Sequence, residues 1–262
     1  MVAKPGRSAM VGIGFGIELI FGLIYAWSVF VLPLEAEFGW TRAETSWAFT
    51  VLFIFFPAGM IAGGRLSERF SLRATGSFAA LLLSVGLFLA SFTNSIPWLV
   101  ISFGAIAGFG IGLGSNTAAQ LLNWFDQRRG LAAGVLSMGF GLGGLLLGSL
   151  AGSTIAAMGW RAAFRILAGV AFAVCFGGFQ FLRKAPERPA AQAEGYPLTK
   201  DYTPAEMLHS MTFWLLFTWS LLVSTAGVMV FGHVVPLGVE LGVAQAAAVL
   251  AMGVLSLSNG LG

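Results

Sequence analysis

The apolar stretches of this sequence carry few side chains that could do chemistry, and Glu18 is the only acid within them. Keeping a carboxylate charged inside a bilayer costs at least a few kcal/mol, so we expect Glu18 to face a cavity or to take up a proton. Tyr25 follows seven residues later on the same helical face, and Trp27 lies on the far side. The spacing allows two interpretations: Glu18 and Tyr25 line a solute path, or they fix helix packing through a polar partner.

Amide and imidazole groups form a second set of polar side chains in the apolar stretches. Asn116, Gln120 and Asn123 are spaced four and three residues apart, which places them on one helical face. They could hydrogen-bond either a polar solute or the neighbouring helix. His233 precedes Pro236 by three residues. Its imidazole could exchange a proton near neutral pH, or it could bind a carbonyl that the proline frees.

Two short charged segments each place an acid beside arginines at a helix end. Such groups either lock neighbouring helices in one state of the protein or serve only as solvated anchors at the membrane surface. The residues concerned are Gly64, Glu68, Arg69 and Arg73 in the first segment and Asp126, Arg128 and Arg129 in the second.

The inventory of reactive side chains argues against an enzyme. The sequence has two histidines, one cysteine and no Asp within an apolar run, so it predicts no catalytic residues, no metal centre and no cofactor. Cys175 lies in an apolar run and is expected to pack in the core. The basic residues cluster in short connections, which implies no nucleic-acid partner.

The elements that position these residues are predicted by composition to be membrane helices. The chain of 262 residues is 57% hydrophobic and 10% charged, whereas a soluble domain has about a quarter of its residues charged. Runs of about 20 apolar residues are long enough to cross a bilayer as α-helices. They cover residues 10–34, 46–64, 74–93, 98–122, 131–157, 163–182, 211–235 and 244–262.

The charges of the connections predict the orientation of these helices. Most of the 14 Lys and Arg residues lie in the N-terminus, in the two charged segments and after residue 182. By the positive-inside rule these connections are cytoplasmic, as is the N-terminus. We therefore expect a multi-pass protein of the plasma (inner) membrane, with the lipid bilayer as a partner.

Three further patterns predict how the chain is organised. Residues 1–182 would form a six-helix half, 183–209 a cytoplasmic linker with a short interfacial helix, and 211–262 the start of a second half, cut within its second helix. Thr-Pro-Ala-Glu at 203–206 and Thr-Arg-Ala-Glu at 41–44 have the spacing of helix caps. Glycines spaced by four, which allow close helix packing, are Gly104, Gly108 and Gly112; Gly130 and Gly134; and Gly144, Gly148 and Gly152.

Several segments resemble known transporter motifs. Gly64–Arg73 resembles the Gly-x-x-x-Asp-Arg-x-Gly-x-Arg loop of the major facilitator superfamily, with Glu68 in place of Asp and Ser71 in place of Gly. Other segments are similar to the monocarboxylate transporters and the bacterial oxalate/formate antiporters. These segments are Tyr25–Phe30, Gly39–Glu44, Trp124–Gly134, Gly159–Phe164 and His233–Pro236.

The resemblance implies an all-α fold of twelve helices in two halves, of which this chain holds the first six, the seventh and most of the eighth. It implies alternating access to a midplane cavity and a small carboxylate as substrate. It also implies that a basic residue following an Asn-Gly segment of helix eight meets the substrate charge, and Asn259-Gly260 looks like that lead-in.

We therefore expect a secondary transporter of small organic anions, working as a monomer by proton symport or anion exchange. Tyr25, Trp27, Asn116 and Gln120 would line the path, and Glu18 or His233 would carry the proton. The two charged segments would gate the cytoplasmic face. The alternative is a membrane sensor or scaffold that uses the same fold without transport.

Overall fold

A computed structural model of the 262-residue chain describes residues 6–125, 129–183 and 202–261, and these residues contain helices and no strands. The first span joins α1 (Arg7–Phe21), a 3₁₀ segment (Gly22–Ala26) and α2 (Trp27–Phe38). The other helices are α3 (Arg42–Arg69), α4 (Leu72–Ala90), α5 (Ile96–Leu99), α6 (Gly108–Leu121), α7 (Arg129–Met158), α8 (Trp160–Ala171), α9 (Gly177–Phe181), α10 (Pro204–Leu208), α11 (Met211–Glu240) and α12 (Gln245–Leu261).

Short π-helical segments make two spans continuous. Val100–Ala107 joins α5 to α6, and Phe172–Phe176 joins α8 to α9. Within the described residues, seven apolar helical stretches are then long enough to cross a membrane, and α12 is a shorter apolar helix of 17 residues. The eight predicted runs all correspond to helices, so the prediction of an all-α, multi-pass membrane protein is confirmed.

The helix caps follow the sequence signals. Thr41 accepts a hydrogen bond from the Glu44 backbone N–H, while the Glu44 carboxylate accepts one from Thr41, and this capping box starts α3. Thr203 and Glu206 form the same arrangement at the start of α10. Both predicted caps are confirmed.

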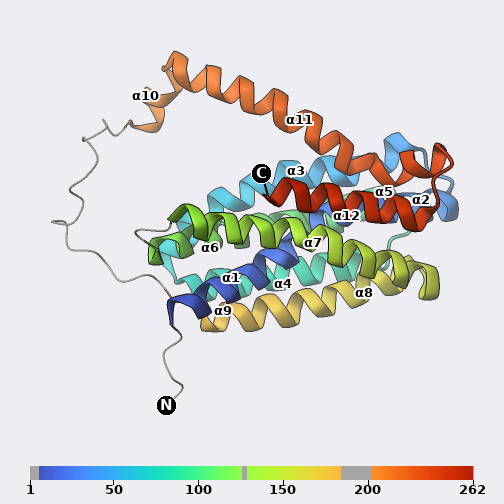
Figure 1. Ribbon diagram of the computed structural model, residues 1–262, viewed down its shortest axis with the longest axis horizontal. Helices are drawn as coiled ribbons and strands as arrows, with labels where there is room; N and C mark the ends of the chain where they lie inside the picture. Colours follow the sequence, from blue (N-terminus) through green and yellow to red (C-terminus); the bar gives the residue numbers. More distant parts are fainter. Residues whose placement is uncertain (1–5, 126–128, 184–201, 262) are drawn as a thin grey trace.

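The helices run between two ends of the bundle. The turns near residues 39–41, 91–95, 159 and 241–244 lie at one end, here called the Gly39 end. The start of α1, the turn at Phe70–Ser71 and the start of α7 lie at the opposite end, here called the Arg129 end (Figure 1).

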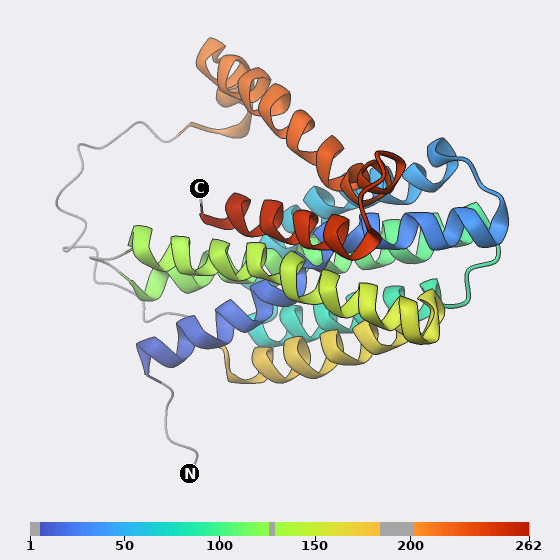
Figure 2. The same ribbon diagram turned by 45° about the vertical axis from the view of Figure 1, so that its right-hand side comes forward.

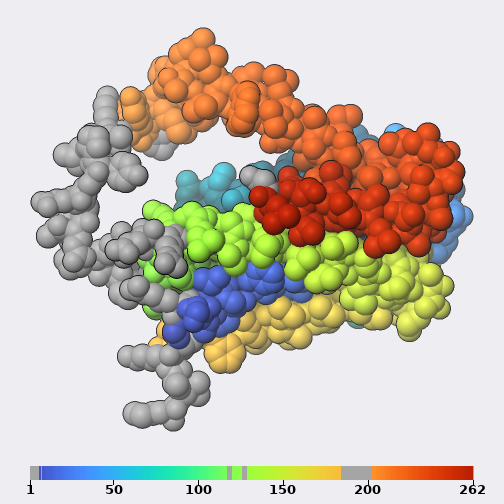
Figure 3. Space-filling model, viewed as in Figure 1, coloured from blue at the N-terminus to red at the C-terminus, as the bar shows by residue number. Residues whose placement is uncertain are grey.

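The α11 helix contacts the bundle at one end only. Its buried residues are Phe231, Gly232, Val235 and Pro236, all in its last third. Figure 2 shows α11 leaning away from the other helices toward its N-terminus, and Figure 3 shows an open gap beneath that part of the helix. The molecule is therefore closed between α11 and the bundle at the Gly39 end and open at the Arg129 end.

Two of the predicted glycine repeats lie at contacts between helices. Side chains added at Gly104, Gly108 and Gly112 would meet Ala48, Leu52 and Phe56 of α3. Side chains added at Gly144, Gly148 and Gly152 would meet Ser256, Met252 and Val249 of α12. We call these contacts the α3–α6 seam and the α7–α12 seam. By contrast, no described residue lies within 4 Å of a Cβ placed on Gly130 or Gly134, so this pair makes no such contact with the part of the chain that the structure describes.

Candidate functional site

A cavity of about 370 Å³ is lined by residues of the first span, α3, α6, α7 and α12, and by Leu122 just after α6. Its polar lining comes from one carboxylate, one phenol, two hydroxyls and one amide, and none of the described lining residues is basic. The lining residues are Glu18, Tyr25, Phe56, Ser115, Leu122, Ala133, Leu136, Ser137, Phe140, Asn259 and Gly260.

Glu18 projects from α1 into this cavity and is 6% exposed. No described residue forms a hydrogen bond with its Oε1 atom. The structure thus brings Glu18 into the same cavity as Tyr25, as their spacing predicts, and shows no polar partner for Glu18 among the described residues.

Tyr25 connects the first span to three other helices. Its hydroxyl accepts a hydrogen bond of 2.9 Å from the Asn259 amide of α12. Its ring stacks on Phe231 of α11 at 4.1 Å between centroids and meets Phe140 of α7 edge-on at 5.3 Å. The 3₁₀ segment that carries Tyr25 therefore lies where α11 and α12 meet the bundle.

Trp27 lies away from the cavity lining. It is 1% exposed and stacks on Phe103 at 4.7 Å and on Phe49 at 6.3 Å. The structure places this side chain in the packed core between the first span, α3 and the fourth span.

The predicted amides of the fourth span also point away from the cavity. Asn116 donates to the carbonyl of Met60 at 2.9 Å, and Gln120 donates to the Ser67 hydroxyl at 2.6 Å. Both contacts reach α3, which corresponds to the helix-packing interpretation of these residues. Ser115, the neighbour of Asn116, lines the cavity instead.

The predicted gate residues occupy the Arg129 end. Gly64, Glu68 and Arg69 belong to the last turns of α3, and the Arg69 guanidinium lies 5.7 Å from the centre of the Phe70 ring. Arg73, in the first turn of α4, donates to the carbonyl of Leu182 at 3.1 Å and so binds the end of the sixth span.

The second charged segment is described only in part. Arg129 donates to the Asn123 side-chain oxygen at 3.3 Å. Asp126 and Arg128 lie outside the described residues.

His233 lies in the part of α11 that contacts the bundle, and it is half-buried. No described residue pairs with its Nδ1 atom. Arg42, Glu35 and Glu240 are close enough to act on it electrostatically. His233 is therefore not part of the cavity lining and lies beside a charged cluster at the Gly39 end.

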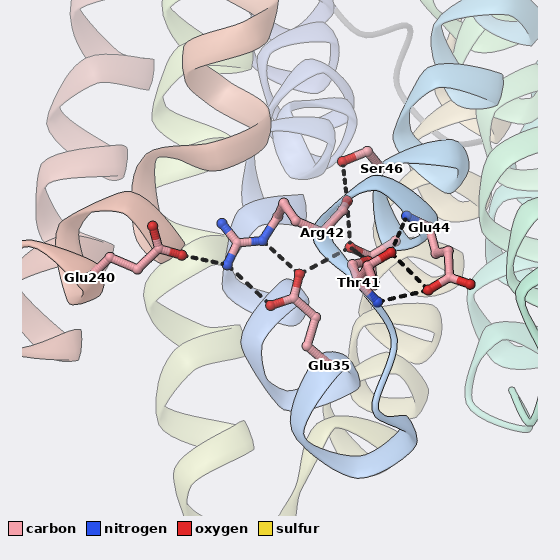
Figure 4. Close-up of polar contacts among 7 residues, drawn as sticks. Glu35, Thr41, Arg42, Glu44, Ser46 and Glu240 are labelled. Atoms are coloured by element: carbon pink, nitrogen blue, oxygen red, sulfur yellow. Dashed lines mark hydrogen bonds and ion pairs between the residues drawn. The ribbon is translucent and has the colours of Figure 1, made fainter.

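That cluster centres on Arg42 (Figure 4). Its Nε donates to Glu35 Oε1 at 2.6 Å and its Nη2 to Glu35 Oε2 at 3.1 Å. Nη2 also donates to Glu240 Oε1 of α11 at 2.9 Å. Nearby, Arg161 pairs with Glu37 at 2.6 Å, and Trp160 donates to the same carboxylate.

Sequence reasoning missed several of these residues. Asn259, Ser115 and Ser137 line the cavity, yet single hydroxyls and amides in apolar runs carry no distinctive spacing. Glu35 and Glu240 stand at the ends of spans, where charges are ordinary. Their proximity to Arg42 depends on how α2 and α11 pack.

A second and larger cavity of about 670 Å³ lies near the Gly39 end, between α2, α7 and α12. Its lining is almost wholly apolar, with residues such as Leu32, Ile155 and Val249, and contains no charged side chain. It offers little to orient a polar solute, so the cavity around Glu18 is the better candidate site.

Comparison with known proteins places the chain among transporters. A sequence profile of the Major Facilitator Superfamily matches residues 10–262. The oxalate:formate antiporter of Oxalobacter formigenes is 28% identical over 243 residues, covering 92% of this chain and 58% of that protein. Monocarboxylate transporter 12 of Rattus norvegicus is 26% identical over 256 residues, covering 87% and 53%. The chain thus spans little more than half the length of these curated relatives.

Solved structures share the fold. A bacterial homolog of the human lysosomal transporter Spinster, in an inward-facing and unoccupied conformation, aligns with a TM-score of 0.71 at 19% identity over 96% of this chain and 59% of that one. A D-xylose-proton symporter aligns with a TM-score of 0.64 at 20% identity over 94% and 65%.

Proposed function

Because the chain belongs to the Major Facilitator Superfamily, a family of transporters and not of enzymes, we propose that the full-length protein is a secondary active transporter of small organic anions. The substrates proposed are monocarboxylates or oxalate- and formate-like carboxylates, moved by alternating access with proton symport or anion exchange. The observation that carries the proposal is the cavity around Glu18 and Tyr25, on a chain similar to an oxalate:formate antiporter.

The cavity offers hydrogen-bond donors of the kind that orient a carboxylate. Tyr25 and Asn259 present a hydroxyl and an amide side by side, and Ser137 adds a hydroxyl. The Ser115 hydroxyl already donates to the carbonyl of Ile111 at 3.0 Å. The described lining holds an acid but no base. Binding of an anion then calls for a basic group from outside this lining.

Glu18 and His233 are the proposed proton sites. Glu18 lies in the cavity, so a proton on its carboxylate would remove the repulsion between that group and an anionic solute. His233 lies at the closed end beside Arg42 and Glu240, so a proton there would act on the contact between α11 and the bundle.

The charges of the two ends indicate which end faces the cytoplasm. The positive-inside rule assigns the Arg129 end to the cytoplasm of the plasma (inner) membrane. With that orientation, the gap beneath α11 opens inward and the contacts at the Gly39 end close the outer side.

The direct test is uptake of radiolabelled oxalate, formate and lactate into liposomes that contain the purified full-length protein. Saturable uptake of one of these anions, driven by a pH gradient or by an unlabelled anion inside, is the expected result. Uptake no faster than in protein-free liposomes for every carboxylate tried would contradict the proposal and favour the sensor or scaffold alternative.

A further inference from the structure

Arg42 binds two carboxylates that belong to different parts of the molecule. Glu35 comes from α2, in the first of the six spans that precede residue 183, whereas Glu240 is the last residue of α11. Figure 4 shows the guanidinium lying between the two acids. Arg42 therefore joins α11 to the bundle by binding one carboxylate of each.

The two ion pairs differ in how firmly they are held. Glu35 binds Arg42 through two hydrogen bonds, also accepts one from the Thr45 hydroxyl at 3.2 Å, and has a side chain only 16% exposed. Glu240 makes a single contact at 2.9 Å, and its side chain is 59% exposed. If α11 moved away, Arg42 would keep Glu35 as its partner and Glu240 would return to water. No charge would then be left buried and unpaired, which is the costly outcome of breaking an ion pair.

The position of this contact matches the closed end of the molecule. The ion pairs that join two described residues all lie at the Gly39 end. The stack of Phe231 on Tyr25 also belongs to the contact between α11 and the bundle. Toward the Arg129 end, α11 has no buried residue among those described.

We propose that the Arg42–Glu240 ion pair is a latch that holds the Gly39 end closed and breaks when that end opens, while Glu35 keeps Arg42 in place in both states. The proposal rests on the alternating access proposed above. It is independent of which solute is carried, because none of the three residues lines the cavity around Glu18.

The latch can be tested by labelling a cysteine that the closed end hides. Val235 is fully buried in α11, one turn after Phe231, and Cys175 is also buried. Labelling of the full-length protein without the Val235 substitution gives the background. In a Val235→Cys background of the full-length protein, a membrane-impermeant maleimide added from the Gly39 side reports opening. We expect Glu240→Gln to raise the initial labelling rate about twofold to fivefold, the range set by a half-exposed ion pair.

Glu44→Gln is the matched control. Glu44 is an exposed acid at the start of the same helix as Arg42, and it forms hydrogen bonds with Thr41 of its own cap. Its labelling rate should equal that of the Val235→Cys parent. An unchanged rate in Glu240→Gln, or an equal rise in Glu44→Gln, would overturn the latch.

A double variant shows whether the effect runs through the ion pair. Once Arg42 is changed to Gln, adding Glu240→Gln should produce no further rise in labelling. A second rise of the same size would overturn the proposal. Uptake measured in parallel keeps the two ideas separate: absent carboxylate uptake with a normal labelling response contradicts the proposed substrate, whereas unchanged labelling contradicts the latch.

Discussion

At the scale of single residues, Glu18 and His233 are titratable groups within spans, and each has a buried atom, Oε1 and Nδ1 respectively, with no hydrogen-bond partner among the described residues. They lie in different places, Glu18 in the cavity and His233 beside the Arg42 cluster. A proton on Glu18 would act on the bound solute, whereas a proton on His233 would act on the contact between α11 and the bundle.

Neutral substitutions at these positions test proton coupling. We expect Glu18→Gln or His233→Ala to abolish acceleration of uptake by a pH gradient, because the group that carries the proton is lost, while exchange of labelled for unlabelled anion continues. The measurement is uptake into liposomes over a range of external pH.

Surface variants of the same residue types serve as controls for proton coupling. Glu44→Gln and His209→Ala change exposed groups near helix ends, and both should retain the pH response. If Glu18→Gln and His233→Ala both transport like the wild type at every pH, neither residue couples protons to transport.

At the scale of helices, the α3–α6 seam depends on the absence of side chains. A Cβ at Gly112 would overlap the backbone carbonyl of Phe56, and a backbone atom cannot rotate out of the way as a side chain can. Overpacking of this kind costs about 1 to 3 kcal/mol.

We therefore expect Gly112→Ala to lower the thermal unfolding midpoint of the purified protein in detergent. Gly134→Ala is the matched control, because no residue that the structure describes lies within 4 Å of its added Cβ. Equal midpoints for the two variants would show that the seam is looser than the structure indicates.

The helices themselves could be predicted from sequence because membrane length and composition act locally. The caps at Thr41 and Thr203 were predictable for the same reason, since their partners lie three residues away. The shared face of Glu18 and Tyr25 follows from their spacing along one span. Each of these features depends on neighbours within a few turns.

The rest of the site depends on packing between helices that are far apart in sequence. The spacing of Asn116 and Gln120 fixes a common face, but only the position of α3 decides that this face meets a helix and not a solute. The Arg42–Glu240 pair and the Tyr25–Asn259 bond join residues about two hundred positions apart, which no local pattern encodes.

At the scale of the whole molecule, the two ends differ in charge and in closure, and the proposed orientation makes the open end cytoplasmic. Cysteines at exposed positions test this assignment. In intact cells, an impermeant maleimide should label Asn94→Cys at the Gly39 end, whereas Ala74→Cys at the Arg129 end should label only after permeabilisation. The opposite pattern would reverse the proposed orientation.

The α7–α12 seam has a consequence in genetic terms. Every missense change of a glycine codon specifies a residue with a Cβ, and a Cβ at Gly144 would collide with the Oγ and Cβ atoms of Ser256 in α12. A Cβ at Gly148 would meet the flexible end of Met252, and one at Gly152 would make ordinary contact with Val249. Within this seam, the Gly144 codon is therefore the one at which every missense change forces a tightly packed neighbour to move.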